Sequence, residues 1–262
     1  MPISRRGFLG CAAGASAVGA AVVTGLRRLF PDVARQPAGC LLIDPGPASP
    51  LRESVAGYAV ALSSLDISYQ QTSFQPPAPA RAIIMPGAID TDHSALAGLS
   101  EHLMSGSIVL YETGAAFFGP EDFDIHKRVI RSVFGLSLHR PVRLWDSAES
   151  LKQSPYIDYH WPVVTKVRDF SCVVPVGLEG GDAIAWFQKV PVALKRRIGK
   201  GTLVFLGSPL GPHLLSADRE AGNWLGAFCS SCCAASPSRI DQCTSSACVR
   251  FLLGTACGGG PF

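Results

Sequence analysis

Short hydrophobic runs alternate with amphipathic stretches through the first half of the chain beyond residue 39. The runs predict strands, and the stretches between them, whose apolar residues recur every three or four positions, predict helices. The predicted strands span 40–44, 67–72, 81–87 and 107–111, and the predicted helices span 51–64, 93–104 and 121–134. Because buried strands that alternate with helices form a parallel sheet covered on both faces, this half favours an α/β fold.

The pattern changes after Leu136, where the apolar runs become shorter and turn residues separate them. Short strands are predicted at 142–145, 163–167, 171–176 and 183–187, followed by a hairpin at 192–201, a strand at 202–206, a loop at 208–213 and a helix at 217–228. The run from Gly180 to Asp182 is a further hairpin signal. We find no internal repeat and no second domain boundary before residue 229.

The basic excess of the chain lies in its first 35 residues. The chain has 262 residues and a formal net charge of +3. Five arginines and one aspartate fall within residues 1–35, so the remainder carries 18 Lys or Arg against 19 Asp or Glu. The folded body is therefore close to neutral, and its composition gives no reason to expect nucleic-acid binding. The basic run Lys195–Arg197 is accordingly interpreted as a solvated strand of the predicted hairpin.

The leader begins with a basic segment and continues as an apolar stretch, rich in Gly and Ala, as far as Leu26. This order is typical of an export signal. Arg5 and Arg6, followed by Phe8 and Leu9, resemble the twin-arginine (Tat) motif, which implies export of a folded protein by the Tat translocase of a bacterial inner membrane. The expected location is periplasmic. Since residues 7–26 are about long enough to span a bilayer, anchoring in the inner membrane by an uncleaved leader is the alternative.

Six of the nine cysteines lie in the last part of the chain: Cys229, Cys232, Cys233, Cys243, Cys248 and Cys257. Because this part has little apolar periodicity, we expect it to lack regular structure. Disulfide pairing, a zinc site and an out-of-frame reading of the natural end are the alternatives. The chain thus divides into an export signal at 1–35, an α/β domain at 36–228 and a Cys-rich tail at 229–262.

Three segments together resemble the class I glutamine amidotransferase-like superfamily. They are Ala82–Gly87, Ser107–Gly114 and Gly199–Ser208, and the last is similar to the Gly-Lys-Gly hairpin and final strand of the trehalose-utilisation (ThuA-like) branch. The resemblance implies a flavodoxin-like three-layer sandwich with a mainly parallel sheet and added C-terminal β hairpins. That branch often places a histidine just beyond the final strand, and His213 lies near this position.

The chain departs from the family at the nucleophile elbow. Catalytic members carry a cysteine there, whereas this sequence has Glu112 at the corresponding position. A glutamate has no thiolate with which to form the acyl intermediate. An acid at a helix N-terminus is also held ionised by the helix dipole, which makes it a poor general acid. Glu112 is therefore interpreted as a ligand contact or as a cap of the following helix, and His213 as a base in a degenerate triad or as a loop histidine.

Other polar residues are predicted to gather at the carboxyl edge of the sheet, where such folds bind ligands. Ligand-contact candidates there are Gly87 and Thr113, beside Glu112. Weak candidates for a divalent metal are Asp90, Asp92 and His93, although Asp92 or its neighbour Thr91 would also serve as a helix cap. We predict no cofactor.

An aromatic run at 156–162 supplies the remaining candidates. Tyr159 and His160 are placed to stack on a sugar ring, or else the run anchors a loop on the core. The favoured function is an exported, non-catalytic domain that binds a small ligand such as a carbohydrate, or a protein partner. The alternative is a carbohydrate-active hydrolase or related enzyme that uses Glu112 and His213, or a metal held by the 90–93 loop.

Overall fold

The computed structural model describes residues 39–44, 52–73, 80–88, 93–114, 119–144, 155–168 and 172–234, except for the side chains of residues 93, 94, 233 and 234. The predicted export signal lies outside these residues, as do Asp90, Asp92 and the four cysteines Cys11, Cys243, Cys248 and Cys257. Within the described part, no helix is both long and apolar enough to cross a membrane.

The first half follows the predicted order of strands and helices. Its elements are β1 (Cys40–Asp44), α2 (Arg52–Ser64), β2 (Tyr69–Ser73), β3 (Ala82–Met85), α3 (His93–Ser105), β4 (Ile108–Glu112) and α4 (Pro120–Phe134). The second half contains β5 (Val142–Arg143), β6 (Tyr156–Tyr159), β7 (Thr165–Arg168), β8 (Cys172–Val173), β9 (Asp182–Phe187), β10 (Val190–Ile198), β11 (Gly201–Leu206), α5 (Gly211–Leu215) and α6 (Arg219–Ala234).

One nine-stranded sheet organises the domain, in the order β2-β1-β3-β4-β11-β10-β9-β6-β7. The strands from β2 to β11 pair in parallel, and every pair from β11 onward is antiparallel. β5 and β8 form a separate two-stranded ribbon. The prediction of a mixed α/β fold whose first half forms a parallel sheet is therefore confirmed.

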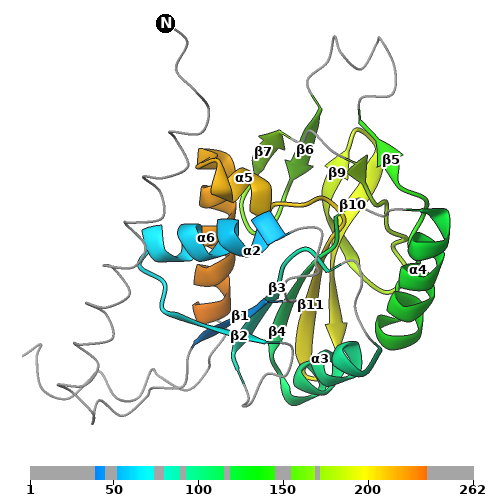
Figure 1. Cartoon of the computed structure of the whole chain (residues 1–262), viewed down its shortest axis with the longest axis horizontal. Coiled ribbons are helices and arrows are strands. Elements are labelled where there is room, and N and C mark those ends of the chain that lie inside the picture. The colour runs from blue at the N-terminus through cyan, green and yellow to red at the C-terminus, as the bar shows by residue number, and fades with distance from the viewer. Residues whose placement is uncertain are drawn as a thin grey trace, which may run out of the picture. The chain divides into compact units, whose positions relative to one another are not determined.

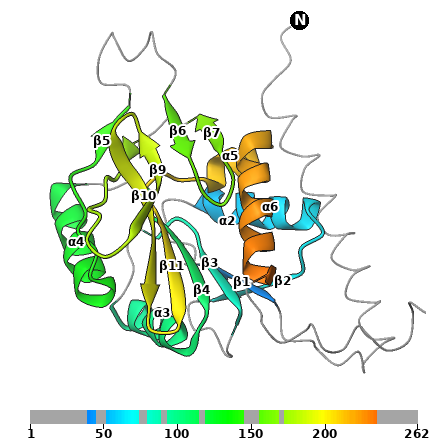
Figure 2. The ribbon, with the colours of Figure 1, turned by 180° about the vertical axis from the view of Figure 1, so that it is seen from behind.

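Helices cover both faces of the parallel part (Figure 1). Figure 2 shows the same arrangement from behind, with α2, α5 and α6 on one side of the sheet and α3 and α4 on the other. Alternate residues of each strand enter different cores: Leu42 packs in the core shared with α2, α5 and α6, whereas Leu41 and Ile43 pack in the core on the other face. This alternation explains why these strands read as continuous hydrophobic runs.

The sequence of α4 specifies its position. Phe123, His126, Ile130 and Phe134 recur every three or four residues and are buried against the sheet. Gly135 ends the helix in the left-handed conformation with φ 65°. Arg196 of β10 donates to the carbonyl oxygens of Phe134 and Gly135 at 3.1 and 2.8 Å, so this arginine stabilises the helix end and is not a merely solvated residue, as the basic run had suggested.

Four details of the second half differ from the predictions. The aromatic run contains strand β6, the loop predicted at 208–213 contains the short helix α5, and the turn at Gly180 does not join two paired strands. The last helix continues to Ala234, and both Cys229 and Cys232 are buried in its core-facing surface. The domain boundary placed after Phe228 is therefore at least six residues too early, because these cysteines behave as small apolar side chains.

Candidate functional site

Glu112, the last residue of β4, is fully buried at the carboxyl end of the parallel strands. Its Oε1 accepts a hydrogen bond from Ser54 Oγ at 2.6 Å. Its Oε2 accepts three, from Tyr58 Oη at 2.7 Å and from the backbone N–H groups of Leu210 and Gly211 at 3.0 and 3.1 Å. Two hydroxyls and two amides therefore surround one carboxylate, which satisfies a buried charge that would otherwise be very costly.

Close packing of α2 against α5 brings these donors together. A Cβ atom added to Gly57 of α2 would lie 1.9 Å from the carbonyl oxygen of Gly211, and one added to Gly211 would lie 2.3 Å from the Cα of Ser54. Neither position has room for a side chain. The two glycines thus allow the backbones to approach until Ser54, Tyr58 and the first amides of α5 all reach Glu112.

Burial raises the pKa of the Glu112 carboxyl above its ordinary value of 4.5. The hydrogen bonds from Ser54, Tyr58 and the two amides favour the ionised form and offset part of this rise. Burial, followed by the neighbouring carboxylate, raises the pKa of Tyr58 well above 10.0, so the phenol stays protonated and continues to donate.

This geometry corrects the predicted surroundings of Glu112. The sequence suggested that the helix directly after β4 would hold the acid ionised, but the amides that contact it belong to the start of α5, almost a hundred residues further along the chain. The carboxylate is also enclosed and fully hydrogen-bonded by protein groups. It contributes to the connection between β4, α2 and α5, and its oxygens have no exposed surface to offer to a ligand.

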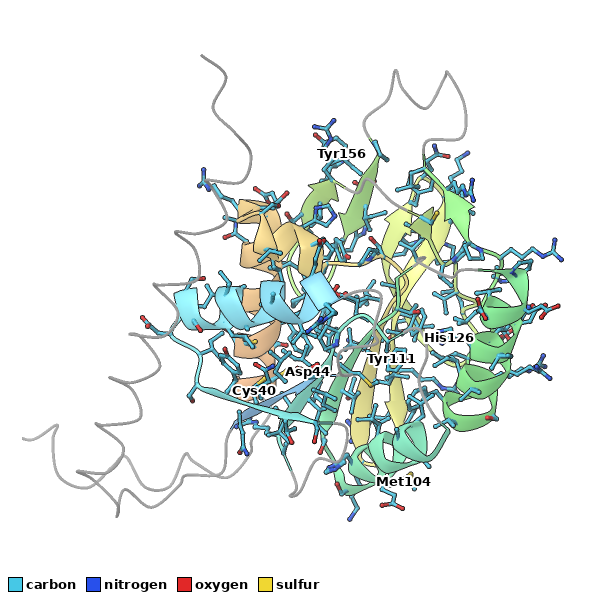
Figure 3. All side chains as sticks on the ribbon, viewed as in Figure 1. Cys40, Asp44, Met104, Tyr111, His126 and Tyr156 are labelled. Carbon is cyan, nitrogen blue, oxygen red and sulfur yellow. The ribbon has the colours of Figure 1, made fainter. Side chains whose placement is uncertain are left out.

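Thr113 and Gly87 follow the neighbouring strands β4 and β3. Thr113 is fully buried, and its Oγ1 lies 3.1 Å from Nε2 of His126 on α4. His126 points toward the sheet beside Tyr111 (Figure 3), and the two ring centroids are 6.4 Å apart. Gly87 has φ 59° and leads into Ala88, whose N–H donates to the carbonyl oxygen of Glu112 at 2.8 Å. Thr113 and Gly87 therefore both lie near Glu112. Thr113 contacts His126 in the core, and Gly87 forms the turn that leads into the hydrogen bond between Ala88 and Glu112.

Sequence reasoning did not single out His126. Its one sequence signal is the position it shares with Phe123 and Ile130 on the apolar face of α4, a pattern that identifies a core histidine. His213, in contrast, was predicted as a base or as a loop residue. It lies on α5 and is buried, 8% exposed.

The described residues include only one of the three metal candidates, His93. His93 is the first residue of α3, while Asp90 and Asp92 are outside the described residues. Among the residues that the structure describes, no group of three or more His, Cys, Asp or Glu side chains is arranged to hold a metal ion. The interpretation of Thr91 or Asp92 as a cap of this helix also lies outside the described residues.

The aromatic run divides between the core and the surface. Tyr159 is 1% exposed and packs against Trp224 of α6, with 5.2 Å between the ring centroids. It is therefore a core residue, and the prediction that it contacts a ligand is wrong. His160 is exposed, and its ring lies 4.6 Å from that of Trp186 on β9, a residue that sequence reasoning did not consider.

A hollow of about 550 Å³ lies elsewhere, between α3 and α4. Its lining comprises Ala97, Ser100, Glu101, Met104, Ser105, Ser132 and Val133. None of these is a residue that the sequence singled out, and the hollow is on the opposite face of the sheet from the helices that enclose Glu112.

No protein-family model and no curated protein sequence matches the chain. Solved structures do match it in fold. They include a beta-galactosidase from Rahnella sp. R3, with a TM-score of 0.56 at 14% identity, and the exo-beta-1,4-mannosidase Op5Man5 from Opitutaceae bacterium strain TAV5, with a TM-score of 0.54 at 15% identity. The matches cover 74% and 81% of this chain but only 31% and 38% of the two enzymes.

A smaller protein matches over almost its entire length. The cytoplasmic protein STM1381 from Salmonella typhimurium LT2 has a TM-score of 0.52 at 13% identity, and the match covers 73% of this chain and 98% of that one. At such identities the likeness extends to the fold alone. The chain is thus similar in fold to about a third of each large glycosidase and to nearly the whole of one small protein.

Proposed function

We propose that the chain is an exported, non-catalytic glutamine amidotransferase-like domain that binds a small ligand or a protein partner. The observation that carries the proposal is the burial and hydrogen bonding of Glu112, which stands where the family has its nucleophile. A nucleophile elbow functions by exposing its side chain to substrate, whereas Glu112 is fully buried and accepts four hydrogen bonds from the protein. The position has a role in the fold that is incompatible with attack on a substrate.

The strand order supports the flavodoxin-like part of this proposal. The parallel strands lie in the order β2-β1-β3-β4-β11, which corresponds to 2-1-3-4-5 when they are numbered along the chain. Helices on both faces are also what a three-layer sandwich requires. The strands β10, β9, β6 and β7 extend this sheet by antiparallel pairs, but they lie between α4 and β11 along the chain and so precede the last parallel strand, whereas the resemblance implied hairpins added at the C-terminus.

The leader supports the proposed location. Arg5 and Arg6, followed by an apolar stretch, are the features that the Tat translocase recognises, so we propose the periplasm as the site of action. Retention of the leader would instead keep the domain at the inner membrane.

A carbohydrate-active hydrolase is the second candidate, favoured by the fold neighbours that include a beta-galactosidase, a mannosidase and an alpha-L-fucosidase from Paenibacillus thiaminolyticus. Glycoside hydrolysis generally requires two carboxyl groups that face the scissile bond. The groups that face Glu112 are hydroxyls and amides, and His213 is buried. These contacts favour the non-catalytic proposal over the hydrolase.

Turnover assays test the choice between the two. The purified full chain is incubated with the p-nitrophenyl glycosides of β-galactose, β-mannose and α-fucose, and separately with glutamine. We expect product release equal to that of a protein-free blank. The matched variants are Glu112→Gln and His213→Asn, each checked for folding by circular dichroism. Release by the wild-type chain that either folded variant loses would overturn the proposal and establish the hydrolase or amidase alternative.

A further inference from the structure

The antiparallel end of the sheet presents two chemically different faces. On β6, Ile157 and Tyr159 point into the core that contains Trp224, so the alternate residues Tyr156 and Asp158 lie on the other face. His160 directly follows the strand and contacts Trp186 on that face. Asp158 pairs with Trp186 of β9 on one side and with Lys166 of β7 on the other. Directly paired residues of antiparallel strands share a face, so all three side chains lie together.

The aromatic members of this face form a platform. The rings of His160 and Trp186 are 4.6 Å apart between centroids and inclined at 51°. His160 is exposed, and Trp186 is half-buried, so the protein supports the indole while leaving part of its surface accessible. Tyr156 is 43% exposed and lies at the outer end of β6 (Figure 3). An indole held in this way offers a rigid apolar surface at low cost in conformational entropy.

A charged pair lies immediately beside the indole. Lys166 Nζ is 2.9 Å from Asp158 Oδ1, and the two side chains are 70% and 33% exposed. The Asp158 Oδ1 atom is itself buried, so water reaches the pair mainly at Lys166, and an ion pair with one such exposed member contributes little to stability. It offers instead a carboxylate that accepts hydrogen bonds and an ammonium that donates them. The two charges of this pair compensate each other, and Arg168, which pairs with Tyr156 and so lies on the same face, adds a guanidinium that can also donate to hydroxyl groups.

We infer that this face, formed by Trp186, His160, Asp158 and Lys166, is a carbohydrate-binding site. A pyranose ring has an apolar C–H face that stacks on an indole and hydroxyl groups around its edge that reach a carboxylate and an ammonium. The inference rests on the proposed function, since it names the ligand class of a domain that binds without catalysis. It also replaces Tyr159, which faces the core, with Trp186 on the surface.

Binding of defined sugars to the full chain tests the inference. Lactose and β-1,4-mannobiose are titrated into the protein by isothermal calorimetry, with tryptophan fluorescence as a second readout. At least one of them is expected to bind. Trp186→Ala should weaken that binding about tenfold through loss of the stacking surface, whereas Trp186→Phe, which keeps a ring, should retain most of it. His160→Ala should weaken binding by a smaller factor.

Gln70→Ala provides the matched control, because Gln70 is an exposed residue of β2 at the opposite edge of the sheet and should leave binding unchanged. Unfolding midpoints of all variants show whether each one folds. Sugar binding that survives both Trp186→Ala and His160→Ala would overturn the location of the site. The absence of binding to either sugar by the wild-type chain would overturn the carbohydrate inference, while the turnover assays would still decide the non-catalytic proposal independently.

Discussion

At the scale of single residues, the carboxylate of Glu112 combines full burial with four donors. Removal of the carboxylate, or of one of its donors, leaves a buried polar group without a hydrogen-bond partner. This costs more free energy than the loss of one ordinary hydrogen bond. Burial raises the carboxyl pKa, and the donors reduce that rise. These two influences make the stability of the domain depend on pH through this one residue.

Glu112→Gln should flatten that dependence. Because the folded-state pKa of Glu112 is raised above 4.5, the folded protein holds the proton more tightly than the unfolded chain does. The stabilisation from this group is complete below the unfolded pKa and is lost as the pH rises through the folded pKa. The difference in unfolding free energy, wild type minus Glu112→Gln, should therefore fall as the pH increases from about 4 to 8.

Urea unfolding of both proteins across this pH range measures the difference. Ser54→Ala serves as a control, because it removes one donor while keeping the acid, and should preserve a pH-dependent difference from Glu112→Gln. A difference that stays constant or rises with pH would contradict the raised pKa.

The sequence reveals the position of Glu112 but not its partners. A glutamate at the end of a hydrophobic run, where relatives keep a cysteine, is visible by inspection. Ser54 and Tyr58 lie 58 and 54 residues earlier, and Leu210 lies 98 residues later. Contacts at such separations depend on how helices pack across the sheet, which no local pattern determines.

At the scale of elements, the contact between α2 and α5 is what encloses Glu112. Gly57 lies in the middle of α2, where glycine is normally a poor helix former. Its retention has a physical cause here, since a Cβ atom would lie 1.9 Å from the carbonyl oxygen of Gly211. Glycine at this position lowers the intrinsic stability of α2 but allows the backbone of α2 to approach α5 closely.

Gly57→Ala should destabilise the domain by about 1–3 kcal/mol, because the added methyl group forces α2 and α5 apart. Gly98→Ala is the matched control: Gly98 lies within α3, and a Cβ atom there would meet nothing within 4 Å. That variant should be neutral or more stable by up to about 1 kcal/mol, through better helix propensity. Thermal and urea unfolding distinguish the two. Equal effects at both positions would show that the close approach is unimportant.

Elements with a strong local pattern were predictable, and those defined by distant contacts were not. Four of the five parallel strands, β1, β3, β4 and β11, are continuous apolar runs, and all four were identified. Strand β6 was missed because its sequence, Tyr-Ile-Asp-Tyr, was interpreted as an aromatic loop, although the alternation of exposed and buried residues in it is regular. The end of α6 was missed because Cys229 and Cys232 were counted with a tail, whereas they pack in the core.

At the scale of the whole molecule, the leader and the body differ in charge and in the arrangement of their apolar residues. The body is close to neutral and has two apolar cores, one on each face of its sheet. The basic charge lies in the leader, where Arg5 and Arg6 stand directly before the apolar stretch and Arg27 and Arg28 directly after it. If the translocase recognises the first pair as guanidinium groups and not as positive charge, then only that pair should be sensitive to replacement by lysine.

Replacement of Arg5 and Arg6 together by lysine should therefore stop export, while the same replacement of Arg27 and Arg28 should leave it intact. Both double variants preserve the charge and hydrophobicity of the leader, so a difference between them reports the geometry of guanidinium recognition. The measurement is the fraction of the full chain in the periplasm and in the membrane of a bacterium with a functional Tat system, compared with a strain that lacks the translocase. Export of the Arg5 and Arg6 variant at the wild-type level, or unchanged export without the translocase, would contradict the proposed route.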